Sequence, residues 1–217
     1  MVQLKEILFS AGIVIHHSQA ALFQKYIEMI LSWNKRTNLV SRQDETRLIE
    51  RHVLESIAAL AIYQIEHQSN IIDIGSGAGF PAIPIHLIRP DLSFLLVESK
   101  RLKALFLKEV VARLNLDRVE IVCERAENLE TNPDNLARFD FAFSRAVASL
   151  DVVYGWASKL IKPGGAVIFW KGGDIENEIQ SLLQAFPNLS VAIDKMDERL
   201  VKVERNKKFV RVQAMKI

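Results

Sequence analysis

The most informative segment is Ile71-Ile72-Asp73-Ile74-Gly75-Ser76-Gly77-Ala78-Gly79-Phe80-Pro81, an apolar strand that runs into a glycine-rich turn. Because glycine has no Cβ, Gly75 and Gly77 let the backbone turn sharply and let a ligand approach it closely. A second apolar run, 94–97, ends at the carboxylate of Glu98. An acidic residue about 20 positions beyond such a turn is suited to hydrogen bonds with ribose hydroxyls. The combination predicts a site for a nucleotide cofactor.

The spacing of the glycines distinguishes between kinds of nucleotide. A dinucleotide fingerprint has the pattern G-x-G-x-x-G, whose third glycine packs a helix close to a bound pyrophosphate. Here the pattern is G-x-G-x-G, Phe80 occupies the position of that third glycine, and Asp73 lies inside the strand end. This arrangement resembles the first motif of S-adenosylmethionine-dependent methyltransferases, whose cofactor has no pyrophosphate. The alternative is a purely structural turn, and Glu98 at the end of the next strand argues against it.

The composition is typical of a globular protein. A chain of 217 residues with 49% hydrophobic and 25% charged residues can bury a substantial core. No apolar run approaches the roughly 18 to 20 residues needed to span a bilayer, and the N-terminus lacks the layout of a signal peptide. The single cysteine, Cys123, excludes an internal disulfide and a cysteine-rich zinc site. We expect a cytoplasmic protein with no metal site and no membrane partner.

The net charge of +2 conceals an uneven distribution of charge. Residues 199–217 contain seven basic residues and one acidic residue, so this tail carries +6 and the remainder of the chain is net acidic. Local positive charge of this kind can bind a phosphate backbone. The alternative is a solvated edge strand whose lysines protect it from aggregation. The sequence leaves both interpretations open.

The residue pattern divides the chain into a helical part and a part in which strands and helices alternate. In residues 1–65, apolar residues recur at three- and four-residue intervals, which is typical of helices. Further along, turn signals such as Lys162-Pro163-Gly164-Gly165 separate the elements. Strands are expected at 70–75, 93–98, 119–123, 139–144, 165–170, 189–195 and 208–215, and helices at 82–89, 100–115, 150–161 and 174–186.

This alternation predicts the fold class. Continuous apolar strands that alternate with helices imply a mostly parallel sheet with helices on both faces. We therefore expect an α/β fold, the Rossmann-like class I S-adenosylmethionine methyltransferase, with a mostly parallel seven-stranded sheet and an N-terminal helical extension. The expected domains are an N-terminal helical cap over 1–65 and an S-adenosylmethionine-binding methyltransferase domain over 66–217.

Ligands of an open α/β sheet bind beyond the carboxyl ends of its strands. After the third strand, Ala126-Glu127 offers a backbone donor and a carboxylate to the edge of an adenine ring, although Glu127 also suits a solvated loop. After the fourth strand, Arg145 is expected to hold a carboxylate or phosphate, because an unpaired buried charge is costly, and a structural ion pair is the alternative. Cys123, at the end of the third strand, is expected to be a small buried hydrophobe.

Several segments together resemble the bacterial RsmG family, also called GidB, of small-subunit ribosomal RNA methyltransferases. The cofactor motif over 72–84 is very similar to that of the family and differs at Ala82, where the family commonly has glycine. Further similar segments are Trp33-Asn34-Lys35, Asn38-Leu39-Val40-Ser41, Arg51-His52-Val53-Leu54-Glu55-Ser56 and Ser144-Arg145-Ala146-Val147-Ala148-Ser149-Leu150. The resemblance covers essentially the whole chain and is looser in the C-terminal third.

The resemblance implies methylation of guanine at N7 in a loop of 16S ribosomal RNA, with S-adenosylmethionine as the cofactor. Because the N7 lone pair is free at neutral pH, no general base is required, and Arg145 is a candidate for active-site positioning. The expected partner is 16S ribosomal RNA or the small ribosomal subunit, and the expected oligomeric state is a monomer. Carried over residue by residue, the cofactor contacts are Gly75, Phe80, Ala126, Glu127 and Arg145, to which the glycine turn and second strand add Gly77 and Glu98.

Guanine N7 lies on the major-groove edge, which is inaccessible in a paired A-form helix, so the target is expected in a loop or as a base turned outward. For His52 the alternative is a purely structural role. The candidate RNA contacts are Arg51, His52, Lys207, Lys208 and Arg211, with Arg36, Arg42 and Arg47 as further candidates.

Two rival functions remain at this point. The first is an NAD-dependent dehydrogenase, which Phe80 in place of the third glycine and the lack of a second substrate domain disfavour. The second is an RNA-binding protein that has kept a methyltransferase fold without its activity, since a fold alone does not establish a function. The intact glycines, Glu98 and Arg145 argue against the second rival.

Overall fold

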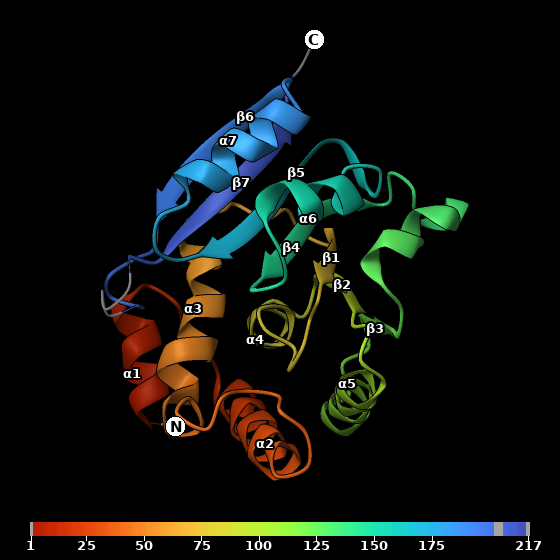
Figure 1. Ribbon diagram of the computed structural model, residues 1–217. Helices are drawn as coiled ribbons and strands as arrows, with labels where there is room; N and C mark the ends of the chain where they lie inside the picture. Colours follow the sequence, from red (N-terminus) through yellow and green to blue (C-terminus); the bar gives the residue numbers. More distant parts are fainter. Residues whose placement is uncertain (1, 202–205, 216–217) are drawn as a thin grey trace.

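The computed structural model describes residues 2–201 and 206–215. Within these residues one seven-stranded sheet forms the centre of the molecule, with the strand order β3-β2-β1-β4-β5-β7-β6 (Figure 1). β7 runs antiparallel to both β5 and β6, and the other strand pairs are parallel. The strands are β1 (Asn70–Ile74), β2 (Ser93–Val97), β3 (Val119–Val122), β4 (Phe139–Arg145), β5 (Ile161–Lys171), β6 (Leu189–Lys195) and β7 (Lys208–Ala214).

Every strand predicted from the sequence is present, and one begins earlier than expected. β5 starts at Ile161 and includes the Pro163-Gly164 pair that was predicted as part of a turn. The pairing of β4 with β5 shifts between Phe139, opposite Ile161, and Phe141, opposite Ala166. Gly164 lies in the left-handed region at φ +84°, so this irregularity accommodates a proline and a glycine inside a strand.

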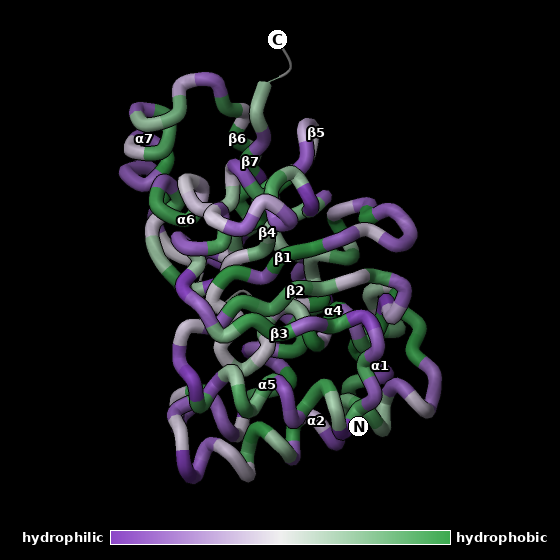
Figure 2. The backbone as a smooth tube through the Cα atoms, turned by 90° about the vertical axis from the view of Figure 1, so that its right-hand side faces the viewer, coloured by the Kyte–Doolittle hydropathy of each residue, from purple (hydrophilic) through white to green (hydrophobic). Residues whose placement is uncertain are grey.

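The sheet is covered on both faces because its apolar side chains alternate. Ile72 and Ile74 of β1 belong to a core cluster with residues of the helices α6 and α7, whereas Ile71 belongs to a second cluster with α4 and α5. Figure 2 shows the apolar strands β1 and β2 in the middle of the molecule, between the helical layers. The helices that follow the strands are α4 (Ala82–Ile88), α5 (Arg101–Leu114), α6 (Leu150–Ala157) and α7 (Glu176–Ala185).

The described residues up to 65 are mostly helical, as predicted, and their helices cover the α4 and α5 side of the sheet (Figure 1). In α2, the buried residues Phe23, Tyr26 and Ile30 recur at three- and four-residue intervals and form its inner face. The Tyr26 hydroxyl donates to the Ala78 carbonyl over 2.6 Å, which fixes α2 against the glycine turn. The elements are α1 (Val2–Ser10), α2 (His17–Asn34), η1 (Glu45–Arg47), the π-helix η2 (Ile49–Val53), α3 (Leu54–Ile57) and η3 (Ala58–Ala61).

β7, which carries part of the basic tail, is an internal strand. It lies between β5 and β6, so the alternative prediction of an edge strand is wrong. The reason is topological: the last strand of the chain inserts antiparallel between two earlier strands, which no local pattern indicates. Lys202, Arg205 and Lys216 of the tail lie outside the described residues. Among the described residues, no helix is both long and apolar enough to cross a membrane.

Candidate active site

The glycine turn connects β1 to α4 at the carboxyl edge of the sheet. Gly75, Gly77 and Gly79 all lie in the left-handed region, at φ +72°, +57° and +94°. A Cβ on Gly75 would lie 2.4 Å from Cγ2 of Val147, so a larger residue there would collide with the loop that follows β4. A Cβ on Gly77 would have only the Gly75 carbonyl oxygen nearby, at 3.9 Å. Gly75 is therefore required by packing, whereas Gly77 borders open space that a ligand can fill.

Glu98 joins the ends of the first two strands. Its Oε2 accepts the Gly77 N–H over 2.9 Å, and its Oε1 accepts the Lys100 N–H over 2.7 Å. The side chain is buried at the end of β2. Because each carboxylate oxygen can accept two hydrogen bonds, Glu98 retains capacity for the hydroxyls of a ribose. Its placement beside Gly77 fits the cofactor that the sequence predicts.

A pocket of about 200 Å³ lies beside the turn and contains three of the predicted cofactor residues. Gly75, Ala126 and Glu127 line it together with Val147 and Trp156. The Glu127 carboxylate makes a 3.4 Å ion pair with Arg125 and remains partly exposed, so it is free to accept from a ligand. The mixture of apolar walls and accessible carboxylates, those of Glu124 and Glu127, fits an adenine ring with its amino group.

The loop after β4 directs two side chains to opposite sides. Ala146 has φ +56°, a left-handed conformation that costs a residue with a Cβ about 1 kcal/mol or more. On one side of this residue Val147 packs over Gly75, and on the other Arg145 extends toward the N-terminal helices. The strained residue thus lies between Val147, which lines the pocket beside the turn, and Arg145, which faces the N-terminal helices.

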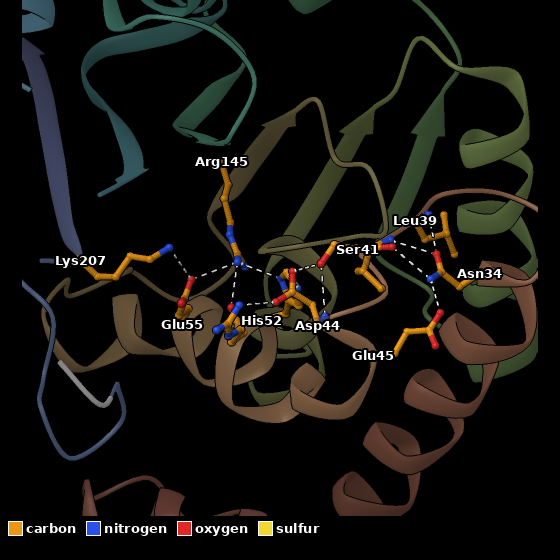
Figure 3. A network of polar contacts seen from close by, with 11 residues as sticks. Asn34, Leu39, Ser41, Asp44, Glu45, His52, Glu55, Arg145 and Lys207 are labelled. Atoms are coloured by element: carbon orange, nitrogen blue, oxygen red, sulfur yellow. Dashed lines mark hydrogen bonds and ion pairs between the residues drawn. The ribbon is translucent and has the colours of Figure 1, made fainter. Parts of the chain in front are cut away.

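Arg145 forms the centre of a polar network between β4 and the N-terminal helices (Figure 3). The two N–H groups of its Nη2 are shared among three acceptors: Glu55 Oε2 at 3.0 Å, the Arg51 carbonyl at 2.9 Å and His52 Nδ1 at 2.9 Å. The sequence left open whether Arg145 holds a ligand or makes a structural ion pair. The structure shows an ion pair within the chain, with Glu55. Arg145 Nη1 is buried and has no hydrogen-bond partner among the described residues, so one donor group remains for a ligand.

His52 is held in one protonation state by this network. Burial, reinforced by the positive charge of Arg145, lowers the pKa of His52 to about 4, so the ring is neutral at pH 7. Since a guanidinium only donates, His52 Nδ1 must accept, and the proton lies on Nε2. The ring stacks on Phe80 with centroids 4.9 Å apart, and the Arg145 guanidinium lies 5.8 Å from the Phe80 centroid. Phe80 therefore belongs to the Arg145 network and does not line the pocket beside the glycine turn.

Asp73 is a fully buried carboxyl group that sequence analysis placed at the strand end without a role. Both of its oxygens lack a hydrogen-bond partner among the described residues. Its pKa is raised to about 8, mainly because of burial and to a smaller extent because of the charge of Glu98, while the polar groups of Ser76 and Ala82 and the charge of Arg145 act in the opposite direction. Asp73 and Arg145 Nη1 are thus two buried polar groups whose hydrogen-bonding capacity the described residues leave unfilled, as expected beside a polar ligand.

The raised pKa of Asp73 has a consequence for stability. In the unfolded chain an aspartate loses its proton near pH 4, but the folded protein retains this proton up to about pH 8. The folded state therefore binds more protons across this interval, and the contribution of Asp73 to stability falls as the pH rises through it. We expect the free energy of unfolding of the wild type, relative to that of Asp73→Asn, to decrease between pH 5 and pH 8. Denaturant titrations of both proteins measure this difference, and a difference independent of pH would contradict the assignment.

The predicted RNA contacts fall into two groups. Arg51, His52 and Lys207 line one polar pocket of about 180 Å³ together with Glu55 and Arg145. Lys207 Nζ donates to Glu55 Oε2 over 3.2 Å, so the start of β7 meets α3 and β4 in this pocket (Figure 3).

The other two residues lie apart from it on β7. Lys208 Nζ donates to the Gly173 carbonyl over 2.8 Å. Arg211 is three positions further along the strand and lies on the opposite face. The basic tail is therefore not one continuous surface.

Cys123 is exposed, so the prediction of a buried cysteine is wrong. The reason is that β3 is an edge strand that ends at Val122 and offers little cover.

Glu55, which accepts from both Arg145 and Lys207, is a site residue that the sequence does not single out. Its place one helical turn after Arg51 is a weak signal that it shares a face with that residue, but its partners lie far away in the sequence.

Comparison with known proteins agrees with this geometry. The family model GidB, described as rRNA small subunit methyltransferase G, matches residues 19–208. Proteins named "Ribosomal RNA small subunit methyltransferase G" are similar to the chain. The one from Carboxydothermus hydrogenoformans is 36% identical, and the aligned region covers 88% of this chain and 81% of that protein. The one from Leuconostoc citreum is 34% identical and covers 93% of this chain and 89% of its own length.

Solved structures support the fold independently. A Methanococcus maripaludis protein assigned to the S-adenosyl-L-methionine-dependent methyltransferases matches with a TM-score of 0.62 at 16% identity, covering 81% of this chain and 90% of that one. The ribosomal protein L11 methylase from Lactobacillus delbrueckii matches with a TM-score of 0.54 at 16% identity. The match covers 75% of this chain and 77% of that one. At these identities the likeness shows the fold alone. The family match over most of the chain goes further: the protein belongs to the GidB family, rRNA small subunit methyltransferase G, and is an S-adenosylmethionine-dependent methyltransferase of ribosomal RNA.

Proposed function

We propose that the protein methylates guanine at N7 in a loop of 16S ribosomal RNA. The observation that carries this proposal is that His52, Glu55, Glu98 and Asp73, the groups around the turn and Arg145 that could act as a general base, are each engaged as an acceptor or hold a proton. His52 Nδ1 accepts from Arg145, and Glu55 accepts from both Arg145 and Lys207. Glu98 accepts from two backbone amides, and Asp73 holds its proton up to about pH 8. A reaction that needs no general base fits this site best.

The chemistry of guanine N7 meets that condition. S-adenosylmethionine supplies an electrophilic methyl group on a sulfonium. The N7 lone pair is free at neutral pH, so the residues of the chain need only align the base and exclude water. Methylation of an exocyclic amine would call for a different motif after β4, where this chain has Ser144-Arg145-Ala146. Methylation of pyrimidine C5 would require a cysteine nucleophile, and Cys123 lines neither of the two pockets of the site.

The two parts of the chain have separate tasks in this proposal. Residues 66–217 form the methyltransferase domain that holds the cofactor, through the glycine turn, Glu98 and the pocket at Ala126. Residues 1–65 form a helical cap whose Arg51 and His52 meet Arg145 at the edge of the sheet. Phe80 offers an aromatic face beside them, and aromatic faces stack on bases turned out of a helix. The RNA therefore enters from the side of the cap.

The partner in this proposal is 16S ribosomal RNA, alone or in the small ribosomal subunit, and the protein acts in the cytoplasm as a monomer. The decisive experiment is methyl transfer from labelled S-adenosylmethionine to small subunits or 16S RNA from a strain that lacks this modification. The product is expected to be cleavable at one guanine by borohydride and aniline, which is the chemical signature of N7 methylation. Label on an exocyclic nitrogen or on a pyrimidine would overturn the proposal.

The basic residues at the start of β7 are expected to contribute unequally to RNA binding. We expect Lys207→Ala combined with Lys208→Ala to weaken RNA binding and to leave the affinity for S-adenosylmethionine unchanged. Each lost phosphate contact lowers the slope of log affinity against log salt by about 0.7 to 0.9. Lys207 is expected to account for most of the loss, because it lies in the pocket with Arg145, whereas Lys208 binds Gly173.

A matched control for this double variant is available at the opposite edge of the sheet. Lys159 and Lys162 each pair with a carboxylate, at 2.9 Å and 2.7 Å, and Lys162 lies at the beginning of β5. Replacing both by alanine removes the same charge and is expected to leave the salt dependence nearly as in the wild type. If both double variants reduce RNA affinity equally, net charge and not the position of Lys207 governs binding.

A further inference from the structure

The loop that connects β4 to α6 lacks the hydrogen bond by which an N-cap side chain usually fixes such a loop to its helix. Ala146 is held at φ +56°, and Ser149, at the N-cap position of α6, makes no side-chain hydrogen bond to the helix. A serine at this position normally accepts from the second or third backbone amide of its helix. The loop nevertheless carries Val147 over Gly75 and follows directly on Arg145. Something outside the loop must hold it in this conformation.

Two charged side chains from other elements supply that support. Lys171, the last residue of β5, donates through Nζ to the Ala148 carbonyl over 3.2 Å and to Glu178 Oε2 over 2.6 Å. Glu178, on α7, accepts in turn from the Leu150 N–H over 3.1 Å. The pair thus binds the loop at one carbonyl and α6 at its first amide. Glu178 takes the place of the missing cap.

We propose that Lys171 and Glu178 are positioning residues for methyl transfer, acting through the loop 146–149. The pair keeps Ala146 in its strained conformation, so that Val147 closes the adenine pocket over Gly75 while Arg145 faces Glu55. The inference rests on the cofactor site proposed above and assigns it two residues that do not themselves line the pocket.

The burial and connections of this pair distinguish it from an ordinary surface ion pair. The side chain of Lys171 is 16% exposed, whereas that of Lys162, in the same strand, is 41% exposed. Exposed pairs contribute little to stability, but a half-buried pair whose members also bind backbone groups constrains the segment that carries those groups. Lys162 pairs with Asp140 over 2.7 Å at the other end of β5 and so provides a control with the same chemistry.

The test compares Lys171→Met, Lys171→Arg and Lys162→Met by calorimetry with S-adenosylhomocysteine, a product that is not consumed. Lys171→Met is expected to weaken binding at least fivefold, because the loop relaxes and Val147 leaves Gly75. Lys171→Arg is expected to restore most of the affinity, since a guanidinium can donate to both acceptors. Lys162→Met is expected to bind like the wild type. In Glu178→Ala, the amide of Leu150 is expected to exchange its hydrogen faster without any ligand present.

Each result decides a separate question. If the wild type binds and Lys171→Met binds equally well, the positioning role is wrong and the cofactor site stands. If Lys162→Met weakens binding as much as Lys171→Met, the effect is a general loss of stability and the inference also fails. If the wild type itself does not bind S-adenosylhomocysteine, the proposed cofactor site fails and the inference fails with it.

Discussion

Gly77→Val is expected to abolish the binding of S-adenosylmethionine while the protein remains folded. The φ of +57° is unfavourable for a β-branched residue, and a Cβ at this position enters open space beside the turn. The side chain therefore occupies volume that the cofactor needs, next to the amide that Glu98 accepts. We expect the dissociation constant to rise at least about 100-fold, equivalent to about 2.7 kcal/mol, as measured by calorimetry.

The control for backbone strain is Gly12→Val. Gly12 has φ +79° and no atom within 4 Å of an added Cβ, so valine there meets the same conformational cost in open space, in the segment between α1 and α2. Both variants are expected to lose similar thermal stability, and only Gly77→Val is expected to lose the cofactor. Wild-type affinity in Gly77→Val would show that the turn does not bind S-adenosylmethionine.

Arg145→Ala is expected to reduce kcat/KM for methyl transfer at least about tenfold, equivalent to about 1.4 kcal/mol of transition-state stabilisation. The guanidinium holds Glu55, His52 and the Arg51 carbonyl in one arrangement, so its removal separates the helical cap from the end of β4. It also leaves a buried carboxylate with Lys207 as its remaining ion-pair partner. Removing one member of a buried pair costs about 3 to 5 kcal/mol, so the melting temperature is expected to fall as well.

The effects of Arg145→Ala on activity and on stability can be distinguished with a control substitution at Arg138, an arginine at the other end of β4. Arg138 precedes β4, pairs with Glu120 at 3.3 Å and lies 5.2 Å from the ring centroid of Phe139, contacts of the same kind as those of Arg145. It is 39% exposed, so Arg138→Ala is expected to leave both the melting temperature and kcat/KM near wild type. Arg145→Lys keeps the charge but not the fork of donors, and an intermediate rate is expected. Unchanged kcat/KM in Arg145→Ala, measured below both melting temperatures, would remove Arg145 from the active site.

Much of the fold was predictable because its signals are local. The strand β1, the turn after it and the helix α4 follow from apolar runs and glycines that are adjacent in the sequence. The pairing of Gly77 with Glu98 was also accessible, since parallel strands bring their carboxyl ends to one edge. The bulge at the start of β5 was missed, because a proline and two glycines favour a turn unless a neighbouring strand stabilises them.

The alternation of strands and helices, the glycine turn and the acidic residue beside it can all be recognised in the amino-acid sequence alone. Each depends on residues within a few positions of one another, or on the common edge of a parallel sheet. The contacts of Glu55 with Arg145, 90 positions away, and with Lys207, 152 positions away, depend instead on how the chain folds in space. Only the tertiary structure placed β7 inside the sheet, which divides the basic tail between two faces and the polar pocket. The net charge of a segment does not show on which side of the sheet its charged side chains lie. An ion pair forms only where the topology brings two such side chains within a few ångströms of each other.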